Sequence, residues 1–169
     1  MKTKNLVMSA LFVALGILIP MIFHSMGLGK AFLPMHIPVL LAGFILGKKE
    51  GFIVGLITPI ISSLITSMPP MFPMVPIMTV ELAVYGLFAG YFYKDKKHNI
   101  FVSLLLTMLI GRVFAGAVVA VLSTFFGFKG KMLPWIIASV TESVPGIILQ
   151  LILIPTITFA SEKVLKENK

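Results

Sequence analysis

The chain has 169 residues, of which 58% are hydrophobic and 12% are charged, and its mean hydropathy is +1.05. Soluble domains are roughly 45–50% apolar and about 25% charged, so this composition excludes an ordinary soluble domain and predicts an integral membrane protein. The net charge of +8 therefore bears on which side of a membrane the basic residues occupy, rather than on nucleic-acid binding. No cysteine is present, which excludes disulfides, thiolate metal ligands and thiol nucleophiles.

Six apolar segments follow one another along the chain, separated by charged residues, prolines and glycines. They cover residues 5–25, 35–47, 51–67, 73–93, 100–126 and 133–161. A transmembrane helix needs about 20 apolar residues, so the second and third segments are short. The sequence predicts an all-α fold, a single domain over residues 1–169 that forms an integral membrane bundle of six transmembrane helices. The first segment also has the basic and apolar regions of a signal peptide, but no small-residue cleavage pattern follows it, so we expect it to remain as the first span.

Basic residues concentrate on one side of these predicted spans. With a cytoplasmic N-terminus, ten lysines fall inside: Lys2, Lys4, Lys48, Lys49, Lys94, Lys96, Lys97, Lys163, Lys166 and Lys169. Three fall outside: Lys30, Lys129 and Lys131. Cytoplasmic loops carry an excess of lysine and arginine, so the sequence predicts two cytoplasmic termini and a multi-pass protein of the cell membrane.

Three charged residues remain at membrane depth, and they are the strongest functional signal in the sequence. Glu81 lies in the fourth segment, Arg112 in the fifth and Glu142 in the sixth. A charge at the bilayer centre costs on the order of 2.5–3.5 kcal/mol on insertion scales, so we expect all three to face the bundle interior or a wet cavity. Counting about 1.5 Å per residue places both carboxylates roughly 12–14 Å below the outer boundary, with Arg112 at a comparable depth or slightly deeper. The sequence predicts that they share one cavity that opens outward.

These charges have a structural explanation beside the functional one. Buried ion pairs often only neutralise one another and fix helix packing. Two acids and one base, however, leave a negative charge or a protonated acid, which a ligand amine, ring nitrogen or hydroxyl would satisfy. His24 and His36 could join the two glutamates around a metal, but they lack any recognisable ligand spacing, so we expect no metal and no cofactor.

Two helix faces are predicted to line the cavity, because their residues recur at spacings of three and four. The fourth segment contributes Met74, Met78, Glu81 and Tyr85, and the sixth contributes Trp135, Ser139, Glu142, Ser143 and Gly146. Acids, hydroxyls, thioethers and an aromatic suit a small, flat, polar ligand better than an ion path. Trp135 is equally well explained as an interfacial aromatic residue. The predicted substrate-binding residues are Glu81, Arg112, Glu142, His36, Tyr85, Trp135, Ser139 and Met78.

Small residues mark places where helices can approach closely. Gly43, Gly47, Gly51 and Gly55 are spaced by four, as are Gly86 and Gly90, and we interpret them as internal packing. Ala10 and Ala14 lie on the first helix, where a small-residue groove could receive a helix of another protein. The phosphate-loop, H-E-x-x-H and G-x-S-x-G signatures do not occur, so we do not expect an enzyme.

The chain resembles, over its whole length, the substrate-binding S component of an energy-coupling factor (ECF) transporter. The resemblance rests on Ala10-x-x-x-Ala14, His36-Ile37-Pro38, Gly43, Gly47, Gly51, Gly55, Pro59, Ser62, Met68-Pro69-Pro70, Glu81 and Tyr85-Gly86. It implies a prokaryotic cell-membrane protein that captures a vitamin in a pocket near the outer face, gated by the loops between spans one and two and between spans three and four. It also implies that Ala10 and Ala14 contact a membrane scaffold, the T subunit, which two cytoplasmic ATPase subunits drive, while the S component topples in the membrane. Nucleic acid is not among the implied partners.

The substrate stays open between two groups of vitamins. The Arg112 guanidinium could pair with a carboxylate or phosphate, which favours pantothenate, niacin or a folate. The two acids favour a ligand with a protonatable nitrogen and hydroxyls, such as pyridoxine, a hydroxymethylpyrimidine or thiamin, and we prefer this second group. The alternative function is a small oligomeric channel or a proton-coupled secondary transporter that uses Glu81 and Glu142 as relay groups.

Overall fold

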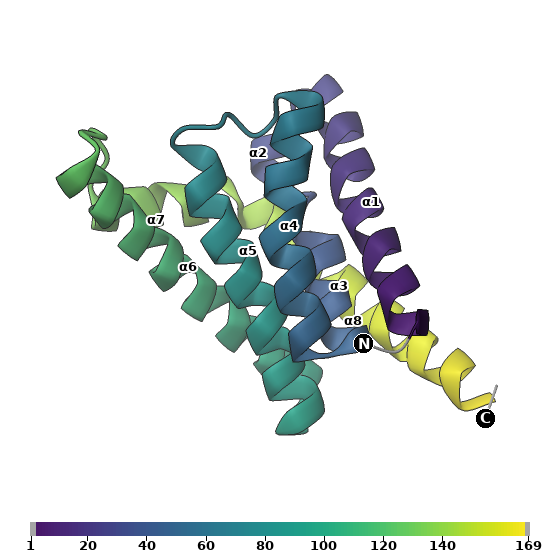
Figure 1. The fold of residues 1–169 in the computed structure, drawn as a ribbon. Helices are drawn as coiled ribbons and strands as arrows, with labels where there is room; N and C mark the ends of the chain where they lie inside the picture. The colour runs from purple at the N-terminus through teal and green to yellow at the C-terminus, as the bar shows by residue number, and fades with distance from the viewer. Residues whose placement is uncertain (1–2, 168–169) are drawn as a thin grey trace.

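The computed structural model describes residues 3–167 and is built from helices. In chain order these are α1 (Thr3–Ser25), α2 (Gly29–Phe32), α3 (His36–Leu46), α4 (Lys48–Thr66), α5 (Met74–Gly90), the π-helical turn η1 (Tyr91–Asp95), α6 (Ile100–Phe125), α7 (Met132–Glu142) and α8 (Val144–Glu167). Every regular element in this range is helical, which confirms the predicted all-α class. The long helices form one bundle, and the described ends of α1 and α8 lie at the same end of it (Figure 1).

Five helices of the described chain are long and apolar enough to cross a membrane, rather than the six that were predicted. They are α1, α4, α5 continued through η1, α6 and most of α8. The second predicted segment, 35–47, forms the helix α3 of only 11 residues. At about 1.5 Å per residue α3 measures roughly 16 Å, about half of a bilayer core of about 30 Å, so it does not cross one alone.

The sixth predicted segment, 133–161, was also expected to be one helix, but it is two. α7 ends at Glu142, α8 begins at Val144, and Ser143 lies between them. Pro145 explains the break, because its ring would clash with the carbonyl of the residue four positions earlier in a continuous helix. Figure 1 shows α7 and α8 running in different directions. Glu142 is therefore at a helix end rather than in the middle of a span.

The short helix α3 is the centre of the bundle. Every residue from His36 to Phe44 is buried, and α3 packs against α1, α4, α5 and α8. A helix that is apolar on all sides is stable only where other helices surround it. The position of α3 places its first residue, His36, deep inside the molecule.

Glycines bring α3, α4 and α5 into direct backbone contact. A Cβ atom on Gly86 would overlap the backbone of Gly51, and one on Gly43 would overlap the carbonyl oxygen of Gly86. Gly47 alone joins α3 to α4, with a φ of +115° that residues with a side chain rarely adopt. The small-residue stripes in these three helices are therefore internal packing surfaces, as the sequence analysis proposed.

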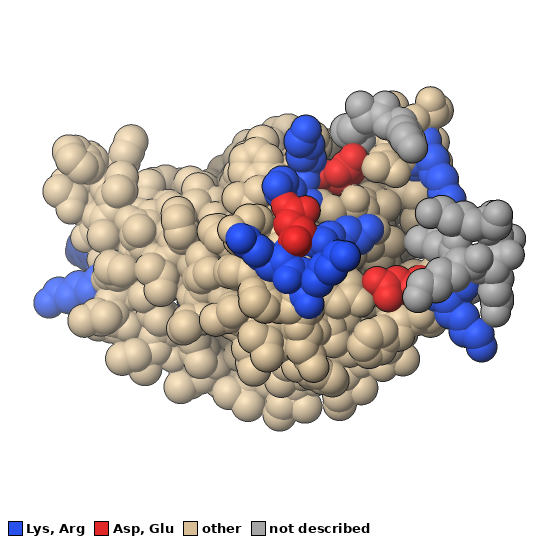
Figure 2. Space-filling model, turned by 90° about the horizontal axis from the view of Figure 1, so that it is seen from below, with Lys and Arg blue, Asp and Glu red and all other residues tan. Residues whose placement is uncertain are grey.

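Polar bonds join different helices at the end of the bundle where the chain ends lie. They link Asn5 Nδ2 to Glu50 Oε1 at 3.0 Å, Tyr93 Oη to Glu162 Oε1 at 3.0 Å, Lys48 to Asp95, and Lys94 Nζ to the carbonyl oxygen of Ile45. Figure 2 looks onto this end and shows lysines clustered around the acidic residues. Lys2, Lys30, Lys166 and Lys169, which were counted in predicting the orientation, lie outside the side chains that the structure describes. This lysine-rich end is the one predicted to be cytoplasmic.

Candidate functional site

A cavity of about 700 Å³ lies at the opposite end of the bundle. Pockets of about 300–1,000 Å³ are typical of small-molecule sites. Its walls come from the end of α1, α2 and the residues that flank it, the start of α3, the start of α5, the middle of α6, and α7, together with residues 68–70 between α4 and α5. Its polar lining residues are His24, His36, Glu81, Arg112, Ser139 and Glu142. Methionines and prolines from the same elements make up most of the remaining surface.

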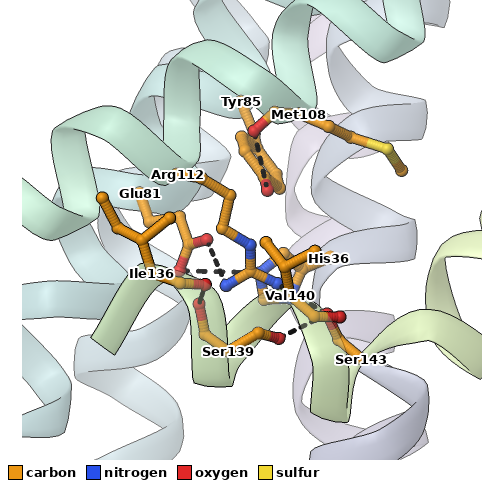
Figure 3. A network of polar contacts seen from close by, with 9 residues as sticks. All are labelled: His36, Glu81, Tyr85, Met108, Arg112, Ile136, Ser139, Val140 and Ser143. Atoms are coloured by element: carbon orange, nitrogen blue, oxygen red, sulfur yellow. Dashed lines mark hydrogen bonds and ion pairs between the residues drawn. The ribbon is translucent and has the colours of Figure 1, made fainter. Parts of the chain in front are cut away.

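An ion pair between α5 and α6 closes the inner part of the cavity. Arg112 Nη1 lies 2.8 Å from Glu81 Oε1, and their side chains are only 9% and 3% exposed. Arg112 Nη2 donates a hydrogen bond to Ser143 Oγ at 3.2 Å, which ties α6 to the junction of α7 and α8 (Figure 3). Both terminal nitrogens of the guanidinium are therefore engaged by the protein itself.

His36 lies beside this ion pair without a hydrogen bond of its own. Its side chain is 2% exposed, and neither ring nitrogen has a hydrogen-bond partner among the described residues. Nε2 is 3.8 Å from Glu81 Oε2, too far for a hydrogen bond. Buried polar side chains usually have a partner, so an unbonded imidazole on a cavity wall is a group that a ligand or water can satisfy.

The residues predicted to share one face of the sixth segment do not all line the cavity, because the helix breaks at the end of α7. Trp135, Ser139 and Glu142 line the cavity. Ser143 instead accepts the hydrogen bond from Arg112, and Gly146 packs against the backbone of α2. Glu142 is exposed, and it makes no ion pair with another side chain in the described part of the chain. The structure thus brings Glu142 to the same cavity as Glu81 and Arg112, but not into their ion pair.

Tyr85 is the one predicted binding residue that does not line the cavity. It is 2% exposed, and its hydroxyl donates to the carbonyl of Met108 at 3.4 Å. Its ring meets the imidazole of His36 edge to face, with centroids 5.2 Å apart, and packs directly on Gly111. A residue four positions after Glu81 shares its helix face but lies one turn deeper. Tyr85 therefore packs against His36 on the side away from the cavity.

The loop of residues 67–73, called the cover below, is bonded to the end of α4. Ser62 Oγ donates to the carbonyl of Met68, and Ser63 Oγ donates to the carbonyl of Pro69, each at 2.7 Å. Met68, Pro69 and Pro70 line the cavity from this position. These bonds were not predicted from the sequence, although hydroxyl residues at the end of a predicted helix are a signal for such contacts with the following loop.

Other lining residues were also not proposed as ligand contacts. Met35 and Met68 line the cavity together with Met74 and Met78. Thioether side chains adapt their shape to irregular spaces and make favourable contacts with aromatic rings. The signal that was missed is position, since Met35 and Met68 lie next to His36 and Pro69 in the stretches that carry the family resemblance. No group of three His, Asp or Glu side chains in the described chain is arranged to hold a metal.

A family model described as the ECF transporter, substrate-specific component, matches residues 4–158. The chain belongs to this family. The resemblance proposed from the sequence is thereby confirmed. No curated protein and no solved structure matches the chain.

Membership of this family establishes the general activity of the protein. Such a component is a multi-pass transporter subunit rather than an enzyme, and it works on a small-molecule substrate together with T and ATPase subunits. A stand-alone channel or proton-coupled carrier, the alternative function, is not favoured by this membership.

Proposed function

We propose that this ECF substrate-specific component captures a water-soluble vitamin or related micronutrient in the cavity at the outer face. The cavity carries the proposal, because it combines a volume of about 700 Å³ with a buried imidazole that no described residue satisfies. Partner subunits then supply the ATP-driven import, since the chain contains no nucleotide-binding signature.

Among vitamins, a ligand resembling pyridoxine or a hydroxymethylpyrimidine fits the lining best. Such a ligand has a flat ring, a ring nitrogen and hydroxyl groups. Trp135 and the methionines offer apolar surfaces to a ring, while His36, Ser139 and Glu142 offer hydrogen-bonding groups. The Glu81–Arg112 pair adds a fixed dipole at the inner end.

The orientation follows from the lysines. Most of the lysines whose side chains are described cluster at the end of the bundle that Figure 2 shows, and the cavity lies at the other end. With that end in the cytoplasm, as the positive-inside rule requires, both termini are cytoplasmic and the cavity faces outward. This arrangement suits import across a prokaryotic cell membrane.

The first helix is the proposed docking surface for the scaffold T subunit. Ala10 and Ala14 are exposed, and so is Leu11 between them, at 50%. Only 22% of the most apolar window of α1 is buried in the bundle, less than for any of the other candidate spans in the described chain. Exposed small residues let a second helix approach closely in a membrane, which supports the proposed contact.

The decisive experiment is to purify the protein from its native membranes and identify the small molecule that is released on denaturation. A vitamin-like molecule recovered in stoichiometric amount supports the proposal. Ion conductance by the protein alone in liposomes, without partner subunits and without a bound molecule, contradicts it and restores the channel alternative.

A further inference from the structure

The charge of the cavity lining follows from which groups are already paired. Glu81 and Arg112 neutralise each other at 2.8 Å. A guanidinium has five N–H donors, and the protein uses two of those on Arg112. An anion that approached the remaining donors would meet a pair without net charge and would be repelled by the Glu81 carboxylate. Arg112 therefore attracts a carboxylate or a phosphate much less than an unpaired arginine would.

The inner wall offers hydrogen-bonding groups on His36. His36 presents an imidazole whose two nitrogens have no partner among the described residues, and it is 2% exposed. The edge-to-face contact with Tyr85 holds this ring in place from below. The two ring nitrogens of an imidazole can both form hydrogen bonds, so His36 suits the polar edge of a ring.

The α7 wall carries a carboxylate that no described side chain pairs. Glu142 lies at the end of α7, on the helix face that also presents Trp135 and Ser139 to the cavity. The carboxylate attracts a cation, and the indole ring, two helical turns away on the same face, offers a flat surface on which an aromatic ring can stack. The same carboxylate repels an anion.

The space between these walls is apolar and large enough for a ring with a substituent. Four methionines line it: Met35, Met68, Met74 and Met78. Its volume of about 700 Å³ lies within the range of about 300–1,000 Å³ that is typical of small-molecule sites.

We infer that this cavity selects its ligand by charge and in one orientation. The ligand is a flat heteroaromatic compound whose hydrogen-bonding edge meets His36, whose ring packs against Trp135 and whose cationic group lies beside Glu142, and anionic vitamins are rejected. This inference rests on the proposed function, since it assumes that the cavity is the vitamin site. It goes beyond that function by assigning a charge class and separate roles to the two walls.

Trp135 allows a direct test, because it is the only tryptophan in the chain and lines the cavity. Its fluorescence in the detergent-purified protein at pH 7 is titrated with three compounds that share one pyridine ring: cationic pyridoxamine, neutral pyridoxine and anionic 4-pyridoxate. Thiamin, riboflavin, nicotinate, pantothenate, biotin and folate extend the panel, with calorimetry as a second readout. We expect the tightest ligand to be a cation, and pyridoxamine to bind at least tenfold more tightly than 4-pyridoxate.

Two variants separate the roles of the walls. Glu142→Gln keeps the shape and removes the charge, so it should reduce the preference for pyridoxamine over 4-pyridoxate about tenfold. His36→Asn should weaken all members of the pyridine series together and leave that preference unchanged. Glu162→Gln, a matched change at the other end of the bundle where Glu162 bonds to Tyr93, should alter neither. Size-exclusion profiles confirm that each variant is folded.

The outcomes distinguish this inference from the proposed function. Tightest binding by an anion, or an unchanged charge preference in Glu142→Gln, overturns the inference and leaves vitamin capture intact. If no compound in the panel binds by fluorescence or by calorimetry, the proposed function itself fails and the inference fails with it.

Discussion

Arg112 Nη1 and Glu81 Oε1 lie 2.8 Å apart on the cavity wall, in side chains that are almost completely buried. Removing one member of such a pair leaves an uncompensated buried charge, which costs about 3–5 kcal/mol. Replacing both members with apolar residues of similar size is much less costly. Single and double variants of the pair can therefore separate its effect on the stability of the protein from its effect on the charge of the site.

Glu81→Gln should lower the stability of the protein by about 3–5 kcal/mol because Arg112 loses its counter-ion. For a chain of this length such a loss lowers the melting temperature by on the order of 10 °C, which thermal unfolding in detergent measures. The double variant Glu81→Gln with Arg112→Met should recover part of the loss. The single variant should also bind 4-pyridoxate more tightly than the parent does, since its guanidinium is released. An unchanged melting temperature would contradict the buried pair.

Gly86→Ala tests the backbone contact of α4 and α5. A glycine-to-alanine change within a helix normally stabilises it by about 0.5–1 kcal/mol. Here the added methyl group would overlap the backbone of Gly51, so the two helices must separate. Overpacking typically costs about 1–3 kcal/mol. We expect a lower melting temperature, and a gain in stability would show that the helices do not touch at this point.

Hydropathy predicted the long helices of the fold well, because lipid requires continuous apolar length. It could not predict that α3 is an internal helix, since an apolar segment has the same hydropathy whether it faces lipid or protein. The division of the last segment was visible in Pro145, whose effect on the backbone is local. A proline alone does not decide whether a helix breaks, because the prolines at positions 20, 59 and 155 lie inside continuous helices. Whether the helix breaks at Pro145 therefore also depends on tertiary contacts.

The candidate site was predictable where the cost of a buried charge was large. Each of the buried charges on Glu81 and Arg112 needs a partner, and the two side chains form an ion pair with each other. Periodicity gave the correct face of α5 but not the depth of Tyr85, because a helix face continues past the bottom of a cavity. The contacts of residues 67–73 and the exposure of Glu142 depend on how loops and helix ends pack. A repeating pattern carries no information about them.

Ala10→Trp and Ala14→Trp test the proposed docking surface on α1. Each adds a bulky ring where we expect a helix of the T subunit to approach closely, so uptake by cells that contain the partner subunits should fall to background. Ligand binding by the purified component should remain within about twofold, because α1 contributes only its far end to the cavity. Ala117→Trp places the same ring on an exposed position of α6 and should leave uptake unchanged. Full uptake by both α1 variants would place the docking surface elsewhere.

The double variant Ser62→Ala with Ser63→Ala tests the cover over the cavity. Both hydroxyls donate to carbonyls of the cover at 2.7 Å, and each hydrogen bond contributes about 0.5–1.5 kcal/mol. Their loss should make opening easier and raise the rate of ligand release roughly tenfold, which stopped-flow fluorescence of Trp135 records. Ser161→Ala removes a hydroxyl that bonds to the preceding turn of α8, far from the cavity, and is the matched control. A release rate equal to that of the control would mean that residues 67–73 do not limit access to the cavity.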